Sequence, residues 1–315
     1  MKKLSVLVPC FNEEEVLPLF YKEAVRVLES LPYTYEILFV NDGSRDGTGK
    51  IVREISANDS HVHYISFSRN FGKESAMYAA LSNTDADYSV IIDADLQQKP
   101  DVIPQMLSIL ETGDYDIVAA VRADHTRERG LSSWFSRRYY KLINRFSETQ
   151  LIDGASDFRM MTREVVQTMA AMTEDGRFTK GLFSWVGFRT CCITYECAER
   201  AAGSSKWNFG KLLRYGMDGF VNFSSAPLKV ALPAGAVCFL IGLVCLIVAV
   251  VEGIASGFAA GSVLLIVSLI LLIGGANLIA AGILGYYLSA VLRETKRRPH
   301  YIVAESDLDG IRRIN

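Results

Sequence analysis

The sequence predicts an α/β domain with a mostly parallel β-sheet, followed by an interfacial segment and a two-helix transmembrane anchor. Short apolar strands alternate with amphipathic helices through residues 1–120, which favours parallel strands covered on both faces. Two long segments without charge follow near the C-terminus. The chain of 315 residues has a formal net charge of −2, which gives no reason to expect nucleic acid as a partner.

The expected elements of the first 120 residues place polar groups at one edge of the sheet. Strands are expected at residues 4–9, 35–42, 62–68 and 88–95, and helices at residues 14–31, 48–58 and 73–81. Ligands of such sheets bind beyond the carboxyl ends of the strands. Polar residues follow three of these ends, in Pro9–Glu13, Asn41–Ser44 and Asp93–Asp95. The sequence has neither a GxGxxG loop nor a P-loop, so dinucleotide and P-loop chemistry are not predicted.

The run Asp93-Ala94-Asp95, with Gln97 two residues later, is a candidate metal site. Residues two apart on a strand leaving the sheet project to one side, so these polar side chains are expected to converge. Mg²⁺ or Mn²⁺ takes oxygen ligands from one or two carboxylates and completes its shell with substrate phosphates. Such an ion would neutralise a departing diphosphate as a Lewis acid. The alternative is an acidic turn after a strand, without a metal.

Two segments, Val230–Val251 and Val263–Leu288, are long and apolar enough to cross a bilayer as helices. Basic residues flank the pair on the same side, at Arg214 and Lys229 before it and at residues 293–298 after it. By the positive-inside rule, the N-terminal domain and both termini are expected to be cytoplasmic, with a turn of about ten residues outside. The chain is therefore expected to be a multi-pass protein of the cell (inner or plasma) membrane. Two buried helices of a soluble protein are the alternative.

The expected organisation has four parts. They are a catalytic domain at residues 1–208, a juxtamembrane amphipathic segment at 209–229, two transmembrane helices within 230–292 and a cytoplasmic tail at 293–315. Gly274, Gly275 and Gly282 suit close helix–helix contact, which leaves open a homo-oligomer through the membrane helices.

A basic segment lies between Arg122 and Arg145, where seven Lys and Arg residues stand against two acidic ones. Aromatic residues such as Trp134 and Tyr139 interleave with the charges. The segment is either a solvated basic helix or an interfacial helix on anionic lipid.

Six segments, in this order along the chain, carry a resemblance to a known family: VLVPCFNEEE, VNDGSRDGT, NFGKESAMYAAL, DADLQQKP, DGASDFRMM and ERAAGSSKW. Together they resemble the family 2 glycosyltransferases with the GT-A fold, a Rossmann-like α/β fold. Within that family they resemble the dolichyl-phosphate-mannose-synthase-like branch, especially bacterial polyprenyl-phosphate glycosyltransferases with two C-terminal transmembrane helices. Many relatives continue DADLQ into a Pro-Pro pair where this chain has Gln98-Lys99-Pro100, so the donor sugar stays unidentified.

The resemblance implies a nucleotide-sugar pocket and a metal site at the strand ends. The nucleoside pocket would be lined by Pro9, Phe11, Asn12, Glu13 and Asp42, with Asp93 and Ala94 contacting the donor. Asp95 and Gln97 would hold Mg²⁺ or Mn²⁺, which makes Asp95 a catalytic residue.

Asp157, in DGASDFRMM, is placed by the resemblance beside the transferred sugar and the acceptor, as a second catalytic residue. It is either the general base of an inverting displacement or a group that orients the acceptor or the sugar. A phosphate monoester has its second pKa near about 6, so at neutral pH the acceptor oxygen hardly needs a base. The structural alternative is an N-cap of the helix expected to follow.

The acceptor phosphate needs cationic partners, and Arg suits bidentate contact with phosphate. The candidates are Arg200, Ser205 and Lys206 in the run RxxGxSK, which looks like the family's signature before the membrane, and Arg122, Arg137 and Arg138 in the basic segment.

These features predict inverting transfer of a hexose from a nucleotide sugar to undecaprenyl or another polyprenyl phosphate at the cytoplasmic membrane face. UDP-glucose is the first choice of donor and UDP-N-acetylglucosamine the second. A processive polysaccharide synthase is one alternative, but the QxxRW motif and further spans typical of such enzymes are missing from the sequence. An inactive adaptor or flippase subunit is another, although it would not need DxD, Asp157 and RxxGxSK together.

Overall fold

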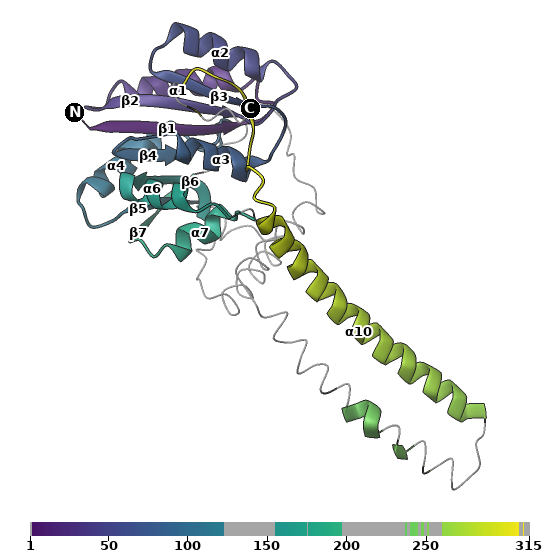
Figure 1. Ribbon diagram of the computed structural model, residues 1–315. Coiled ribbons are helices and arrows are strands. Elements are labelled where there is room, and N and C mark those ends of the chain that lie inside the picture. Colours follow the sequence, from purple (N-terminus) through teal and green to yellow (C-terminus); the bar gives the residue numbers. More distant parts are fainter. Residues whose placement is uncertain are drawn as a thin grey trace.

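The computed structural model describes residues 2–122, 155–174, 176–196, 237, 240–244, 247–248, 251, 260–308 and 311. One sheet of eight strands, in the order β7-β5-β6-β4-β1-β2-β3-β8, organises the globular part of these residues (Figure 1). Its central strands run parallel and are β1 (Lys3–Cys10), β2 (Thr34–Asn41), β3 (Val62–Phe67) and β4 (Tyr88–Ile91). The expected α/β fold with a mostly parallel sheet is confirmed.

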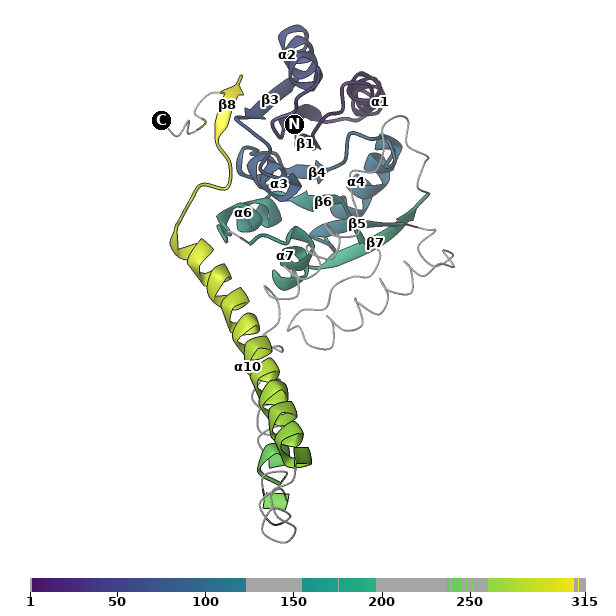
Figure 2. The ribbon, with the colours of Figure 1, turned by 90° about the vertical axis from the view of Figure 1, so that its right-hand side faces the viewer.

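Helices cover both faces of this sheet (Figure 2). One face carries α1 (Leu17–Leu28), α2 (Thr48–Asn58) and α4 (Ile103–Glu111), preceded by the short helix η1 (Pro100–Val102); the other carries α3 (Lys73–Ser82), α6 (Arg163–Ala171) and α7 (Thr179–Trp185). Alternate residues of β1 enter two separate cores, with Val6 and Val8 in one and Leu7 in the other. Burial on both faces explains the continuous apolar sequence of these strands.

Strand β6 (Ala155–Thr162) runs antiparallel between β4 and β5 (Ile117–Arg122), while β7 (Thr190–Tyr195) pairs parallel with β5. Because β6 is reversed, its first residues lie beside the carboxyl end of β4, where Ile91 pairs with Arg159. Strand β4 ends at Ile91, earlier than the expected residue 95. The following residues form a turn in which Leu96 has a φ of +58°, so Asp93 and Asp95 project from a turn rather than from a strand.

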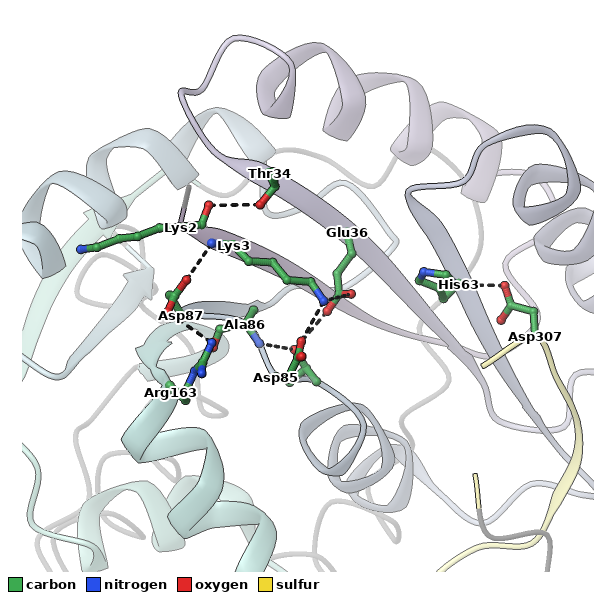
Figure 3. A network of polar contacts seen from close by, with 11 residues as sticks. Lys2, Lys3, Thr34, Glu36, His63, Asp85, Ala86, Asp87, Arg163 and Asp307 are labelled. Atoms are coloured by element: carbon green, nitrogen blue, oxygen red, sulfur yellow. Dashed lines mark hydrogen bonds and ion pairs between the residues drawn. The ribbon is translucent and has the colours of Figure 1, made fainter. Parts of the chain in front are cut away.

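The amino ends of the strands carry a network of ordinary ion pairs (Figure 3). Lys3 Nζ lies 2.8 Å from Glu36 Oε2 and 2.8 Å from Asp85 Oδ1. Asp87 accepts a 2.8 Å hydrogen bond from the backbone nitrogen of Lys3 and lies 3.2 Å from Arg163 Nη2. These contacts join the starts of β1, β2, β4 and α6 at the edge opposite the predicted site.

Helix α10 (Ala260–Thr295) leaves the globular part as one long rod (Figure 1). Among the described residues, one stretch, Ile273–Thr295, is long and apolar enough to cross a membrane. The first expected span, residues 230–251, lies mostly outside the described residues, and the juxtamembrane segment 209–229 lies wholly outside them. The two-helix anchor is therefore not confirmed.

After α10 the chain returns to the sheet as β8 (Val303–Ser306), antiparallel to β3. Tyr301 stacks on Phe67 with ring centroids 4.8 Å apart, and Asp307 Oδ1 accepts a 2.7 Å bond from the backbone nitrogen of Tyr64. Part of the segment expected as a cytoplasmic tail thus supplies an edge strand, which covers the polar edge of β3.

Candidate active site

The carboxyl ends of β1, β2 and β4 and the start of β6 meet at one sheet edge. Asp93 comes from the turn after β4 and Asp157 from the third position of β6. Lys73, the first residue of α3, joins them, with Nζ 2.7 Å from Asp93 Oδ1 and 2.7 Å from Asp157 Oδ2. The structure therefore brings together the two acidic groups expected at the donor and at the acceptor.

Two members of this cluster, Lys73 and Asp157, have strongly shifted pKa values. Burial by itself lowers the pKa of Lys73, but the charges of Asp157 and Asp93 outweigh it and raise that pKa above its ordinary value. Burial raises the pKa of Asp157, but the positive charges of Lys73 and Lys180 outweigh it and hold that pKa well below its usual range. Asp157 is consequently an anion throughout the neutral pH range and a weak proton acceptor.

A loop clamp fixes the backbone that precedes Lys73. The carboxylate of Asp42, at the end of β2, accepts hydrogen bonds from Phe71 N at 2.7 Å, Gly72 N at 2.9 Å and Asn70 Nδ2 at 2.9 Å. Asp42 is 3 % exposed; its burial raises the pKa of its carboxyl, and the two backbone donors act in the opposite direction. The clamp packs so closely that a Cβ on Gly43 would lie 2.2 Å from the carbonyl carbon of Arg69.

The loops after β1 and β2 are tied to each other beside this clamp. Asn12 adopts a left-handed φ of +51°; its backbone nitrogen donates to Ser44 Oγ at 2.9 Å, and its Oδ1 accepts from Arg45 N at 2.9 Å. The backbone nitrogen of Glu13 donates to Thr48 Oγ1 at 2.8 Å. Pro9 is buried, while Phe11, Asn12 and Glu13 are half-buried. The five residues expected in the nucleoside pocket, including Asp42, therefore lie at one edge, and their contact with a nucleoside stays a prediction.

The turn after β4 carries the residues expected at the metal. Asp95 Oδ1 accepts from Gln97 N at 3.1 Å, and the buried Gln98 accepts from Asp93 N at 3.3 Å through Oε1. Ala94 is buried, whereas Asp95 and Gln97 are half-buried. No group of three or more His, Cys, Asp or Glu in the described part of the chain is arranged to hold a metal ion. Asp95 and Gln97 fit one all the same, because Mg²⁺ takes few oxygen donors from protein when substrate phosphates complete its shell.

Five of the six expected acceptor-phosphate residues, Arg137, Arg138, Arg200, Ser205 and Lys206, lie outside the described residues. The backbone of Arg122 ends β5 opposite Tyr195, and its side chain lies outside the described part. Since β5 runs in the same direction as β4, Arg122 lies at the same sheet edge as Asp93.

Lys73 is the site residue that the sequence analysis missed. The sequence feature that could have indicated it is in the segment NFGKESAMYAAL, where a Lys is the first residue of a helix. A basic residue there is unfavourable to the helix dipole, so its position needs a reason other than helix stability. The neighbouring Glu74 Oε2 accepts hydrogen bonds from the backbone nitrogen and hydroxyl of Thr179, which join α3 to α7.

A mostly parallel sheet whose strand ends carry an Asp-x-Asp turn, with a reversed strand bringing a further aspartate beside it, agrees with the GT-A-like α/β fold that the family resemblance implied. The model of the family "Glycosyl transferase family 2" matches residues 5–169, and the chain belongs to that family.

Similar proteins extend over nearly the whole chain. The "Bactoprenol glucosyl transferase" of Shigella phage SfII is 40% identical over 96% of this chain and 98% of its own length. The "Prophage bactoprenol glucosyl transferase homolog" of Escherichia coli K12 is 38% identical over 96% of this chain and 98% of its own length. Among solved structures, mannosyl-3-phosphoglycerate synthase from Rubrobacter xylanophilus overlaps with a TM-score of 0.48 at 20% identity, covering 69% of this chain and 71% of that chain.

Proposed function

We propose that this protein transfers glucose from UDP-glucose to a polyprenyl phosphate such as undecaprenyl phosphate, at the cytoplasmic face of a membrane. The observation that carries the proposal is the extent of the match to bactoprenol glucosyl transferases. It covers 96% of this chain, so it includes the apolar C-terminal region as well as the catalytic domain. A relative that shared only the sugar-handling domain would leave the lipid acceptor without support.

The strand-end loops are suited to hold the donor. Asn12 and Glu13 are fixed by the loop after β2, so little conformational freedom remains to be lost when a nucleoside binds between these loops. Asp93 and Ala94 follow at the end of β4, where the diphosphate would reach the turn. Mg²⁺ or Mn²⁺ held by Asp95 and Gln97 would supply positive charge to the departing diphosphate.

The acceptor would reach Asp157 from the membrane side, with its phosphate bound by Ser205 and by the basic residues Arg122, Arg137, Arg138, Arg200 and Lys206. The acceptor oxygen would attack the anomeric carbon on the face opposite the UDP, so the configuration inverts. Asp157 lies 2.7 Å from Lys73 Nζ, and its low pKa favours the orienting role over the general base.

A hairpin of two transmembrane helices fits the described parts of the anchor. Residues 240–244 are helical, and a Cβ on Gly242 would lie 3.5 Å from Ile273 Cδ1 of α10, so the two segments are in close contact. Large apolar side chains of α10 are exposed, Leu278 by 75%, which suits lipid. Both β1 and β8 belong to the catalytic sheet, which supports both chain ends on one side of the membrane.

The test uses the full-length protein in detergent with undecaprenyl phosphate, Mg²⁺ or Mn²⁺, and UDP-glucose, UDP-N-acetylglucosamine or GDP-mannose in parallel. Mass spectrometry of the lipid fraction should find a hexosyl phospholipid with UDP-glucose. Asp95→Asn should lower its formation by about 100-fold or more, since charge stabilisation at the leaving group is lost. Asp114→Asn, an exposed acid before β5 at the opposite edge, is the matched control and should leave the rate unchanged.

Each of the other outcomes supports a different function. Formation of an N-acetylhexosaminyl lipid would show that the donor is UDP-N-acetylglucosamine and not UDP-glucose. Elongation of a soluble glycan without lipid labelling would favour the processive synthase. Binding of UDP-glucose without any transfer would favour an inactive adaptor.

A further inference from the structure

Lys73 lies at the centre of the candidate active site, but the proposed transfer reaction does not yet assign it a role. Its Nζ is within 2.9 Å of both oxygens of Asp93 and 2.7 Å from Asp157 Oδ2. The two carboxylates come from segments more than 60 residues apart in sequence, the turn after β4 and strand β6. Two like charges this close repel each other unless a cation stands between them. Lys73 supplies that cation.

The surroundings hold Lys73 in place from two directions. The Asp42 clamp accepts the backbone hydrogen bonds of Phe71 and Gly72, directly before it. Glu74, directly after it, is bound by Thr179 of α7. Gly72 has a φ of +101°, a backbone conformation that residues other than glycine rarely adopt. Glycine at this position therefore allows the chain to turn directly into α3. The ammonium is thus directed at the carboxylates by a built scaffold.

We propose that Lys73 is a positioning residue of the transfer: it holds Asp157 beside Asp93 as an anion, so that Asp157 orients the acceptor and takes no proton. This inference rests on the proposed function. In the transfer, a bond forms between an acceptor phosphate oxygen and the anomeric carbon. The bond from that carbon to the β-phosphate oxygen breaks, and UDP leaves with the electron pair. The acceptor enters as a phosphate that has already lost its proton to solvent, so the step balances without a base.

The opposing interpretation makes Lys73 a purely structural ion pair, or a contact to the donor diphosphate. The three roles differ in what Lys73→Met changes. A structural pair lowers the melting temperature alone. A diphosphate contact raises KM for UDP-glucose. A positioning residue lowers kcat while KM for the donor changes little.

The experiment measures kcat and both KM values of the full-length protein in detergent for Lys73→Met, Lys73→Arg, Asp157→Asn and the double variant Lys73→Met/Asp157→Asn. We expect Lys73→Met to lower kcat by about 100-fold, because a misplaced catalytic group costs roughly that factor. Lys73→Arg keeps the charge and should restore kcat to within about tenfold of the wild type. In the Asp157→Asn background, Lys73→Met should change kcat by less than about threefold, since the two residues act as one unit.

Lys3→Met is the matched control. Lys3 also bridges two carboxylates, at the opposite edge of the same sheet, and its loss should leave kcat unchanged. The solvent deuterium isotope effect on a single turnover should be near unity in the wild type, because no proton moves with the sugar. Three results would each overturn the proposal. The first is a rise in KM for UDP-glucose without a fall in kcat. The second is a double variant whose loss of kcat equals the product of the two single losses, and the third is a large isotope effect.

A measurement without metal, donor or acceptor separates this inference from the proposed function. Lys73→Met should lower the melting temperature by leaving two carboxylates together, and adding Asp157→Asn should recover part of the loss. If this recovery occurs but no donor labels a lipid, the proposed function is wrong. The Lys73–Asp157 pair would then be a structural contact with no role in transfer. If lipid is labelled and the melting temperatures show no coupling, the inference about Lys73 fails alone.

Discussion

Two lysines at opposite edges of one sheet make nearly the same contacts. Lys73 bridges Asp93 and Asp157 at the carboxyl ends of the strands, and Lys3 bridges Glu36 and Asp85 at the amino ends, all at 2.7–2.8 Å. The exposed fraction of both lysine side chains is 37%. The carboxylates differ in exposure: Asp157 and Asp93 are 17% and 27% exposed, whereas Glu36 is 13% and Asp85 84% exposed.

The difference lies in how each cluster is held. Lys3 belongs to β1; its partner Glu36 lies on the neighbouring strand β2, and its partner Asp85 lies in the loop before β4. Lys73 belongs to a helix, and a separate clamp at Asp42 fixes the loop before it. Identical ion-pair chemistry therefore serves stability at one edge and, by our proposal, orientation of reactants at the other.

Breaking the clamp should have the largest effect on this comparison. Asp42→Asn replaces a carboxylate that accepts three hydrogen bonds by an amide that has one acceptor oxygen, so buried donors lose their partner. We expect a loss of about 2 kcal/mol in the free energy of unfolding, seen as a lower melting temperature. We also expect kcat to fall by about 100-fold, because Lys73 loses its fixed position.

The exposed Asp114→Asn serves again as the control, and it should change neither quantity. The family resemblance gives Asp42 a different task, contact with the nucleoside. If KM for the donor nucleotide rose while the melting temperature and kcat stayed constant, Asp42 would act by that contact and the clamp would be irrelevant to catalysis.

The parallel half of the fold could be predicted from the sequence because its order is local. Strands β1 to β4 and helices α1 to α3 follow one another along the chain, and the pattern of apolar residues in each segment predicts its type. The expected helix at residues 48–58 coincides with α2. Strands β6 and β8 were not predicted, since β6 pairs with strands on both sides by long-range contacts and β8 returns after a helix of 36 residues. Single-sequence patterns carry no information about such partners.

The same limit applies to the site. Convergence of the β1, β2 and β4 ends follows from the rule for parallel sheets, and the structure places those residues at one edge. The position of Asp157 came from the family resemblance, because periodicity does not show that β6 is reversed beside β4. Lys73 was missed for a physical reason: its partners are set by tertiary packing, and its only local sign was a positive charge at the start of a helix.

A chain ending at Pro299 would test whether β8 stabilises the flank of the sheet without serving either lysine cluster. It loses the buried Val303 and the stacking of Tyr301 on Phe67, so we expect roughly 3 kcal/mol less stability. The uncovered edge of β3 should also promote aggregation, measured by light scattering. A chain ending at Leu308 keeps β8 and is the control. An equal loss in both chains would place the stabilisation beyond residue 308.

Lys3→Met should have the smallest effect and sharpens the contrast with Lys73. Lys3 holds the pKa of Asp85 below its ordinary value of 3.8 through a hydrogen bond and its charge. The folded state therefore gains stability above that pH and loses it as the pH falls through the lowered pKa. Because Asp85 is largely exposed, this pair contributes only about 0.5 kcal/mol. Glu36, the other partner of Lys3, keeps a 3.1 Å hydrogen bond from Thr84 Oγ1 when Lys3 is replaced. Melting curves of wild type and Lys3→Met should differ slightly at pH 7, begin to approach each other as the pH falls below 3.8, and converge below the lowered pKa of Asp85. A persistent difference at low pH would mean that Lys3 acts through packing of its aliphatic stem instead of its charge.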